Sequence, residues 1–228
     1  MEDSAVVIGA SGGIGAAMTE RLRASGRFVA VHALSRTETG LDLEDEASIA
    51  AAAASIAKGP PPTLVFVATG VLHAGHEPER TYKALSAEHL LRDHRINAVG
   101  PALVAKHFLP LLPRDRRAVF AALSARVGSI GDNRLGGWHA YRASKAALNM
   151  ILRTLAVELG RSHPQAVVAG LHPGTVETPL SAPFRRGVAP DKLFAPDFSA
   201  ERLLAVLDGL TPAQSGGVFA WDGARIPE

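Results

Sequence analysis

Short apolar runs alternate along the chain with longer segments of helical periodicity. The first run, residues 6–8, leads through a glycine-rich bend into a helix at about 14–24. Further strands are predicted at 27–33, 41–43, 63–68, 118–123, 165–171 and 218–221, and further helices at 46–57, 87–112, 143–160 and 200–207. This alternation predicts a doubly wound α/β fold, with a mostly parallel sheet of about seven strands covered by helices on both faces.

The composition narrows the range of partners. The length of 228 residues and the apolar content of 47% suit a single domain over residues 1–228. With 24 basic and 22 acidic residues, the net charge of +2 gives no reason to expect nucleic acid or an anionic membrane as a partner. No apolar run is long enough to cross a bilayer. The absence of cysteine excludes disulfides and thiol catalysis, so we expect a cytoplasmic protein.

The glycine-rich bend predicts a binding site for a diphosphate. Glycines allow the tight turn, the approach of a ligand to bare backbone and close helix packing, while the helix N-terminus attracts the anion. The candidate binding residues here are Gly9, Ser11, Gly13, Ile14 and Gly15.

Tyr141 and Lys145 are the candidate catalytic pair. Four residues separate them at the head of an apolar run, so in a helix both project from one face. A neighbouring ammonium favours the phenolate, and it is expected to lower the pKa of Tyr141 toward a value useful for proton transfer. An ordinary exposed pair has the same spacing, and it is the glycine-rich bend upstream that favours catalysis.

The motifs Gly9-x-x-x-Gly13-x-Gly15, Tyr141-x-x-x-Lys145 and Pro173-Gly174 together resemble the short-chain dehydrogenase/reductase family. Residues 128–130 and 136–138 look most like the branch that holds C-factor-like proteins and small carbonyl reductases. The resemblance implies a Rossmann-type fold, a nicotinamide cofactor and a carbonyl or alcohol substrate. It also implies contacts of the cofactor with Asp42, Gly70, Tyr141, Lys145, Pro173, Gly174, Val176 and Thr178. For Asp42, capping of the following helical turn is the competing role.

Arg36 favours NADP(H) over NAD(H). It follows the second predicted strand, where an acidic side chain would bind a ribose hydroxyl and an arginine suits a 2′-phosphate. A solvated loop arginine is the alternative, which would leave NAD(H) as the cofactor.

Asn97 is expected to support a proton relay. In the family, the main-chain carbonyl of such an asparagine holds a water near the lysine. Pro101 has no N–H to offer the carbonyl four residues earlier, which is that of Asn97, and a kink is predicted here.

The position of the family's catalytic serine is altered. Counting back three residues from Gly128 reaches Ala125, so Ser124 is our candidate for the group that polarises the carbonyl, with Ser129 as the alternative. Strand alternation would point Ser124 away from the face that Ala125 uses, unless the strand has ended. Trp138 is expected to form a wall of the substrate site, with a surface position in the loop as the alternative.

Two segments suggest further organisation. Residues 179–197 are rich in proline and lack a clear period, which indicates a substrate lid, with Arg185 and Arg186 as candidate anion contacts or solvated side chains. The helix 143–160 is apolar on almost every face, so we expect a homodimer or homotetramer in which a second copy covers part of it.

Two functions remain open at this point. The first is an NADP(H)-dependent oxidoreductase, in which Tyr141 is general acid or base, Lys145 and Asn97 support it, and Ser124 polarises the carbonyl. The second is a cofactor-binding sensor or signalling protein of the same fold with weak or no turnover, which Ala125 supports. Nine histidines without ligand spacing give no indication of a metal site.

Overall fold

A mostly parallel sheet forms the centre of the computed structural model, which describes residues 2–73, 77–184 and 189–228. Within these residues seven strands pair in the order β2-β1-β3-β4-β5-β8-β9, and only β8 and β9 run antiparallel to each other. The strands are β1 (Ser4–Ile8), β2 (Ala30–Leu34), β3 (Pro62–Val67), β4 (Ala118–Leu123), β5 (Ala166–His172), β8 (Val218–Ala220) and β9 (Arg225–Ile226). The predicted doubly wound α/β fold is confirmed.

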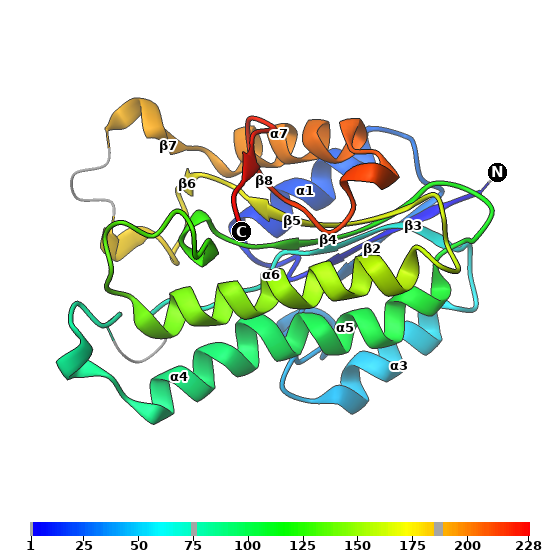
Figure 1. The fold of residues 1–228 in the computed structure, drawn as a ribbon. Helices are drawn as coiled ribbons and strands as arrows, with labels where there is room; N and C mark the ends of the chain where they lie inside the picture. Colours follow the sequence, from blue (N-terminus) through cyan, green and yellow to red (C-terminus); the bar gives the residue numbers. More distant parts are fainter. Residues whose placement is uncertain (1, 74–76, 185–188) are drawn as a thin grey trace.

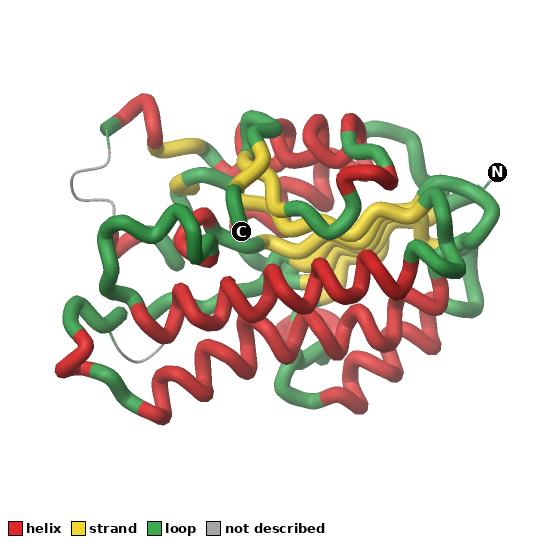
Figure 2. Tube along the Cα trace, in the orientation of Figure 1, coloured by secondary structure: helices red, strands yellow, loops and turns green. Residues whose placement is uncertain are grey.

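Helices cover both faces of this sheet (Figures 1 and 2). One face carries α1 (Gly13–Ala24) and α7 (Pro196–Gly209), and the other carries α3 (Glu46–Ile56), α5 (Gly100–Phe108) and α6 (His139–Leu159). The remaining helical elements are α2 (Arg36–Thr39), α4 (Ala87–His94), the π-helical turn η2 (Arg95–Val99) and the 3₁₀ turns η1 (Tyr82–Ala84), η3 (Leu109–Leu111), η4 (Arg126–Gly128), η5 (Ala182–Phe184), η6 (Pro190–Lys192) and η7 (Pro212–Gln214).

Strands β1 to β5 contribute to two apolar cores, one on each face of the sheet. In β1, Val6 and Ile8 pack in the core under α3, α5 and α6, while Ala5 and Val7 pack in the core under α1 and α7. Since both faces are buried, the strands have continuous apolar sequences rather than alternating ones. This is why short apolar runs located most strands correctly.

The predicted strand at 41–43 is wrong. Leu41 and Leu43 are buried, but this segment makes no ladder, and the seventh strand is β9 near the end of the chain. Asp42 accepts a hydrogen bond from the amide of Glu44 (3.0 Å), whereas the cap of α3 is Asp45. Asp42 therefore stabilises the turn before the helix, and the two leucines fill the core without strand pairing.

The predicted helix 87–112 is interrupted where Pro101 was expected to act. Between α4 and α5 the chain forms the π-helical turn η2, in which the Gly100 amide donates to the Arg95 carbonyl. Because proline lacks an N–H, the Asn97 carbonyl has no donor four residues later. The expected kink takes the form of this wider turn.

The predicted loop 179–197 contains regular structure near its C-terminal end, which its sequence pattern did not predict. Leu193–Phe194 (β7) pairs in parallel with Thr175–Val176 (β6), and α7 begins at Pro196 rather than at residue 200. Arg185 and Arg186, the candidate anion contacts, lie outside the described residues.

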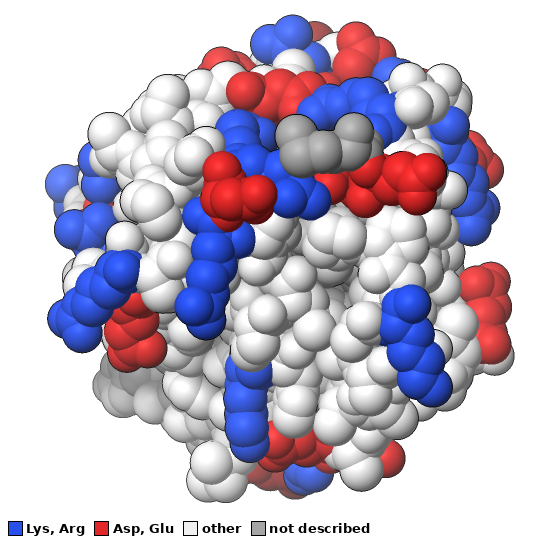
Figure 3. All heavy atoms as spheres, turned by 90° about the vertical axis from the view of Figure 1, so that its right-hand side faces the viewer, with Lys and Arg blue, Asp and Glu red and all other residues white. Residues whose placement is uncertain are grey.

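Charged side chains of both signs are mixed on the surface. On the face shown in Figure 3, basic and acidic residues lie next to each other and much of the remaining area is uncharged. None of the helices in the described ranges is long and apolar enough to cross a membrane.

Candidate active site

Three adjoining pockets lie along the edge of the sheet where the parallel strands end. In this fold, ligands bind at the point where strand order reverses, which here is between β1 and β3. The first pocket has a volume of about 340 Å³, the middle pocket about 280 Å³ and the outer pocket about 350 Å³. Gly12, Thr69 and Gly70 line both the first and the middle pocket, while Tyr141 and Thr178 line both the middle and the outer pocket.

The first pocket collects the residues predicted for the adenosine end of a dinucleotide. Its lining includes Gly9, Ser11, Arg36, Asp42 and Gly70. Arg36 is exposed at the start of α2, directly after β2. The structure therefore brings together residues that are up to 61 positions apart in the sequence.

The glycine turn is packed so closely that side chains would not fit at its positions. Its backbone therefore remains accessible to a ligand. Gly9 has φ +84°, and a Cβ at Gly15 would lie 2.1 Å from the Gly9 carbonyl oxygen. A Cβ at Gly13 would lie 2.9 Å from the Thr178 side chain. Gly15 lines none of the three pockets, so it acts through close packing, whereas Gly13 and Ile14 line the middle one.

Thr69 was not singled out in the sequence. It lies two residues after the end of β3 and lines the first and middle pockets. Its hydroxyl is buried and has no hydrogen-bond partner in the described structure. A buried polar atom without a partner, together with the bare backbone of the glycine turn, fits a dinucleotide lying across both pockets.

Tyr141 and Lys145 line the middle pocket from the first turns of α6. The Lys145 Nζ lies 5.8 Å from the centre of the Tyr141 ring and donates to the Leu123 carbonyl at the end of β4 (2.8 Å). Both residues are buried. The structure thus brings the predicted pair next to the glycine turn, as expected.

Asn97 lies behind the pair and lines none of the pockets. Its side-chain amide donates to the Val71 carbonyl (2.9 Å) and to the Ser144 hydroxyl (3.0 Å), and it accepts from the Val71 amide (2.8 Å). These bonds tie the segment after β3 to α6. Because the Asn97 side chain is occupied by these hydrogen bonds, its main-chain carbonyl is the group left for the predicted relay.

The turn after β5 completes the middle and outer pockets. Pro173 and Thr178 line both, and Gly174 (φ +78°) and Val176 line the outer one. A Cβ at Gly174 would lie 2.6 Å from the Phe194 ring, so this turn packs closely against β7.

Residues 3–189 match the family described as short chain dehydrogenase. The chain belongs to this family.

Two sequence relatives and one solved structure illustrate this membership of the short-chain dehydrogenase family. C-signal of Myxococcus xanthus is 38% identical over 139 residues, which cover 60% of this chain and 78% of that protein. The 1-hydroxy-2-glutathionyl-2-methyl-3-butene dehydrogenase of Rhodococcus sp. (strain AD45) is 30% identical over 232 residues, 97% of each chain. The crystal structure of an NADPH-bound carbonyl reductase from chicken fatty liver superposes with a TM-score of 0.84 at 25% identity and covers 100% of this chain and 94% of that one. The resemblance to the branch of C-factor-like proteins and carbonyl reductases is confirmed.

The altered serine position of this short-chain dehydrogenase is visible in the structure. Ala125 is buried against Leu72 and Tyr141 and lines the outer pocket. The neighbouring Ser124 lines the middle and outer pockets, but its hydroxyl donates to the Asn149 Oδ1 (2.6 Å). Ser129 lines none of the pockets and accepts a bond from the Asp132 amide.

The electrostatics of Tyr141 differ from the prediction. Burial raises the pKa of Tyr141, and the negative charge of Asp93 raises it further. Burial also lowers the pKa of Lys145 to about 8, against the opposing effect of Asp93. The expected lowering of the Tyr141 pKa by Lys145 is therefore wrong for this structure, because loss of solvent and the charge of Asp93 both raise it.

Two buried carboxyl groups near the pair were missed in the sequence. Asp93 in α4 is 1% exposed and Glu79 is 3% exposed, and one oxygen of each has no hydrogen-bond partner in the described structure. Burial and the charge of Glu79 raise the pKa of Asp93 to about 6. The sequence could have indicated only Asp93 as a neighbour of the site. It precedes Asn97 by four residues, so in a helix the two side chains share one face.

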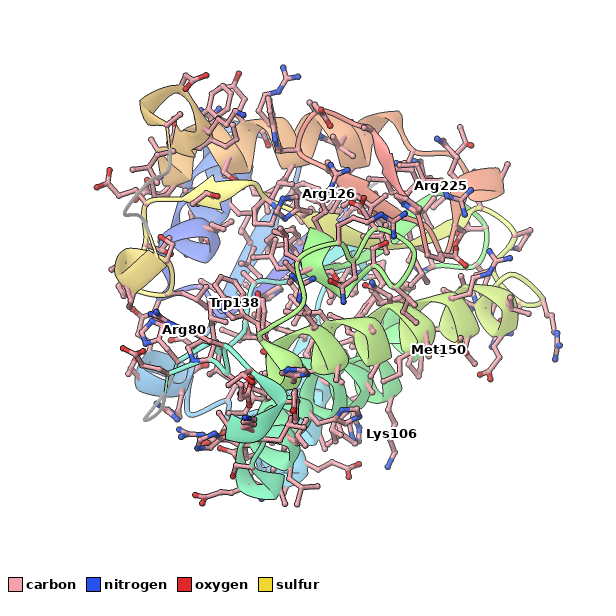
Figure 4. All side chains as sticks on the ribbon, turned by 60° about the vertical axis from the view of Figure 1, so that its left-hand side comes forward. Arg80, Lys106, Arg126, Trp138, Met150 and Arg225 are labelled. Carbon is pink, nitrogen blue, oxygen red and sulfur yellow. The ribbon has the colours of Figure 1, made fainter. Side chains whose placement is uncertain are left out.

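The outer pocket has mainly apolar walls. Its apolar lining includes Leu72, Val127, Trp138 and Leu180. Arg126 and His172 are among its polar residues. Figure 4 shows Trp138 and Arg126 on the side of the molecule where the strands end, and Trp138 is one wall of the outer pocket. Burial lowers the pKa of His172 to about 4, with Arg126 acting in the same direction, which leaves the imidazole neutral at physiological pH. No cluster of three or more potential metal ligands occurs within the described residues.

Proposed function

We propose that the chain is an NADP(H)-dependent oxidoreductase that transfers a hydride between nicotinamide and a carbonyl or alcohol substrate. The observation that carries the proposal is the position of Tyr141, which lines both the middle pocket beside the glycine turn and the outer pocket. A proton donor at that junction faces the place where a cofactor and a substrate would meet.

The cofactor would be held by the first and middle pockets. Gly9, Ser11, Gly13 and Ile14 would receive the diphosphate, and Arg36 would pair with a 2′-phosphate. NADPH in the related carbonyl reductase supports this choice. When bound, the cofactor supplies the hydride, and the chain supplies orientation and proton transfer.

Tyr141 would donate a proton to the carbonyl oxygen of the substrate. Since burial and Asp93 raise the pKa of Tyr141, the phenol keeps its proton at neutral pH, which suits the reductive direction. Lys145 and the main-chain carbonyl of Asn97 would return a proton to Tyr141 through water. The apolar outer pocket favours aldehydes or ketones with an apolar or aromatic body.

Ser124 is our proposed second donor to the carbonyl oxygen. Its hydroxyl faces Asn149, whose amide presents its oxygen. A half-turn of that amide would present Nδ2 instead, so Asn149 would donate to Ser124 and release the hydroxyl proton for the substrate. Ser124 would then act beside Tyr141.

The alternative is a cofactor-binding sensor with weak or no turnover. Ala125 at the serine position and the 38% identity to C-signal support it. Such a protein would bind NADPH without needing the Tyr141 hydroxyl.

Two further features complete the proposal. Residues 179–197 would form the substrate lid, since Pro179, Leu180 and Ser181 already line the middle or outer pocket. The chain would form a homodimer or homotetramer through α6, because Met150 and Val157 leave exposed apolar side chains on this helix. Figure 4 shows Met150 on α6.

Tyr141→Phe tests the function directly. We expect the variant to lose NADPH-dependent reduction of a panel of aldehydes and ketones, followed by NADPH absorbance, and to bind NADPH as the parent does in a fluorescence titration. Full activity in the variant would refute the assigned mechanism. NADPH binding by the parent without turnover on any carbonyl compound would favour the sensor.

A further inference from the structure

The amino-terminal end of α6 is an unusual helix start. Gly136, Gly137 and Trp138 have φ values of +63°, +66° and +53°, so three consecutive residues adopt the left-handed conformation. Trp138 is the one non-glycine residue with positive φ in the described chain. Such a conformation is costly for a residue with a Cβ, and it persists where surrounding contacts hold it.

The helix also lacks a cap from its own sequence. Trp138 occupies the N-cap position and contributes no side-chain bond to the free amides of the first turn. Helix starts normally use a Ser, Thr, Asp or Asn side chain for this purpose. The acceptor for α6 must therefore come from elsewhere.

Glu79 provides that acceptor from a segment about 60 residues earlier. Its main-chain carbonyl accepts the Trp138 amide (2.5 Å), and its Oε2 accepts the Ala140 amide (3.2 Å). The second bond has the geometry of a cap, because Ala140 is in the first turn of α6. A carboxylate at this end also benefits from the positive end of the helix dipole.

Both bonds act on the turn that leads into Tyr141. Ala140 directly precedes Tyr141, and the Trp138 ring packs edge-on against the Tyr141 ring with 6.3 Å between their centres. Trp138 and Tyr141 both line the outer pocket. A shift of this turn would move the proton donor and one wall of the pocket together.

We propose that Glu79 is a positioning residue, which clamps the start of α6 and thereby fixes Tyr141 and Trp138 at the outer pocket. This inference rests on the proposed role of Tyr141 in proton transfer. Glu79 touches neither the cofactor pockets nor the outer pocket, so its effect passes through the helix.

The test compares Glu79→Ala, Glu79→Gln and the matched control Glu77→Gln. Glu77 lies two residues earlier and forms an exposed ion pair with Arg80. Glu79→Ala should lower kcat on the order of 10- to 100-fold and raise KM for the carbonyl compound, with KM for NADPH unchanged, because a small misplacement of the donor is costly. Glu79→Gln keeps an oxygen that accepts the Ala140 amide, so it should restore most of the activity.

A second measurement does not depend on turnover. Acrylamide quenching of Trp138 fluorescence should increase in Glu79→Ala but not in Glu79→Gln or Glu77→Gln, with a Trp138→Phe background to subtract Trp221. Unchanged kinetics and quenching in Glu79→Ala would overturn the clamp, and so would a loss that Glu79→Gln does not restore. If the parent protein itself shows no turnover, the proposed function fails. The quenching comparison still shows whether Glu79 holds the start of α6 in place.

Discussion

Replacing Asp93 by asparagine should remove a pH-dependent cost from the folded state. Asp93 is 1% exposed, and one of its carboxyl oxygens has no partner in the described structure. The groups around it are Glu79, Tyr141 and Lys145 in addition to His89 and Arg92 on its own helix. Burial and Glu79 dominate, and they raise its pKa from the ordinary value of 3.8 to about 6.

The magnitude follows from the difference between these two pKa values. The unfolded chain releases the Asp93 proton near pH 3.8 and the folded chain at about 6, so the folded state binds more protons in between. Stability therefore falls as pH rises through this window. The full difference corresponds to about 3 kcal/mol, of which about 2 kcal/mol develops between pH 4.5 and pH 8.

Urea unfolding of the parent and of Asp93→Asn at pH 4.5 and pH 8 measures this contribution. The free energy of unfolding of the variant minus that of the parent should be about 2 kcal/mol larger at pH 8 than at pH 4.5, because the variant lacks the carboxyl group whose ionisation destabilises the parent. Effects of the substitution that do not involve protons cancel in this comparison. Asp115→Asn, whose side chain is 75% exposed, is the control. A pH-independent difference for Asp93→Asn would refute the reasoning.

Other consequences can be measured on the same protein. Arg36→Asp should shift the ratio of kcat/KM for NADPH over NADH toward NADH by on the order of 10- to 100-fold, the value of a charged hydrogen bond, and an unchanged ratio would exclude Arg36 as the selector. Ser124→Ala should lower kcat/KM by on the order of 10²–10³. Adding Ala125→Ser to that variant should recover part of the lost kcat/KM. A decrease of less than tenfold in Ser124→Ala alone would exclude Ser124 as the donor. Met150→Asp should lower the mass measured by light scattering if α6 forms the interface, and an unchanged oligomer would argue against that interface.

The order of elements could be read from the sequence because the central strands β1, β3, β4 and β5 are buried on both faces. Runs such as 118–123 are apolar throughout, and the predicted and observed strands coincide there. The segment 41–43 has the same local pattern, yet its leucines reach the core from an irregular backbone. Local pattern specifies burial, whereas pairing depends on neighbours that are distant in the sequence.

Within the candidate site, the motifs located the residues but not their environments. The spacing of Tyr141 and Lys145 predicted a shared helix face, and the structure has both in the middle pocket. The charge balance around Tyr141 depends on Asp93, and that around Asp93 depends on Glu79. These two carboxyl groups come from other segments and belong to no family motif. Likewise, the hydroxyl of Ser124 faces Asn149, a contact that no spacing rule predicts.

The parallel pairing of β6 with β7 has a consequence for specificity. It anchors both ends of the stretch between residues 176 and 193 beside the outer pocket. The cost of closing a chain segment grows only slowly with its length, so the stretch can gain or lose residues while its two anchors stay in place. Grafting this stretch from relatives with other substrates would therefore exchange the proposed lid and leave the glycine turn and Tyr141 intact.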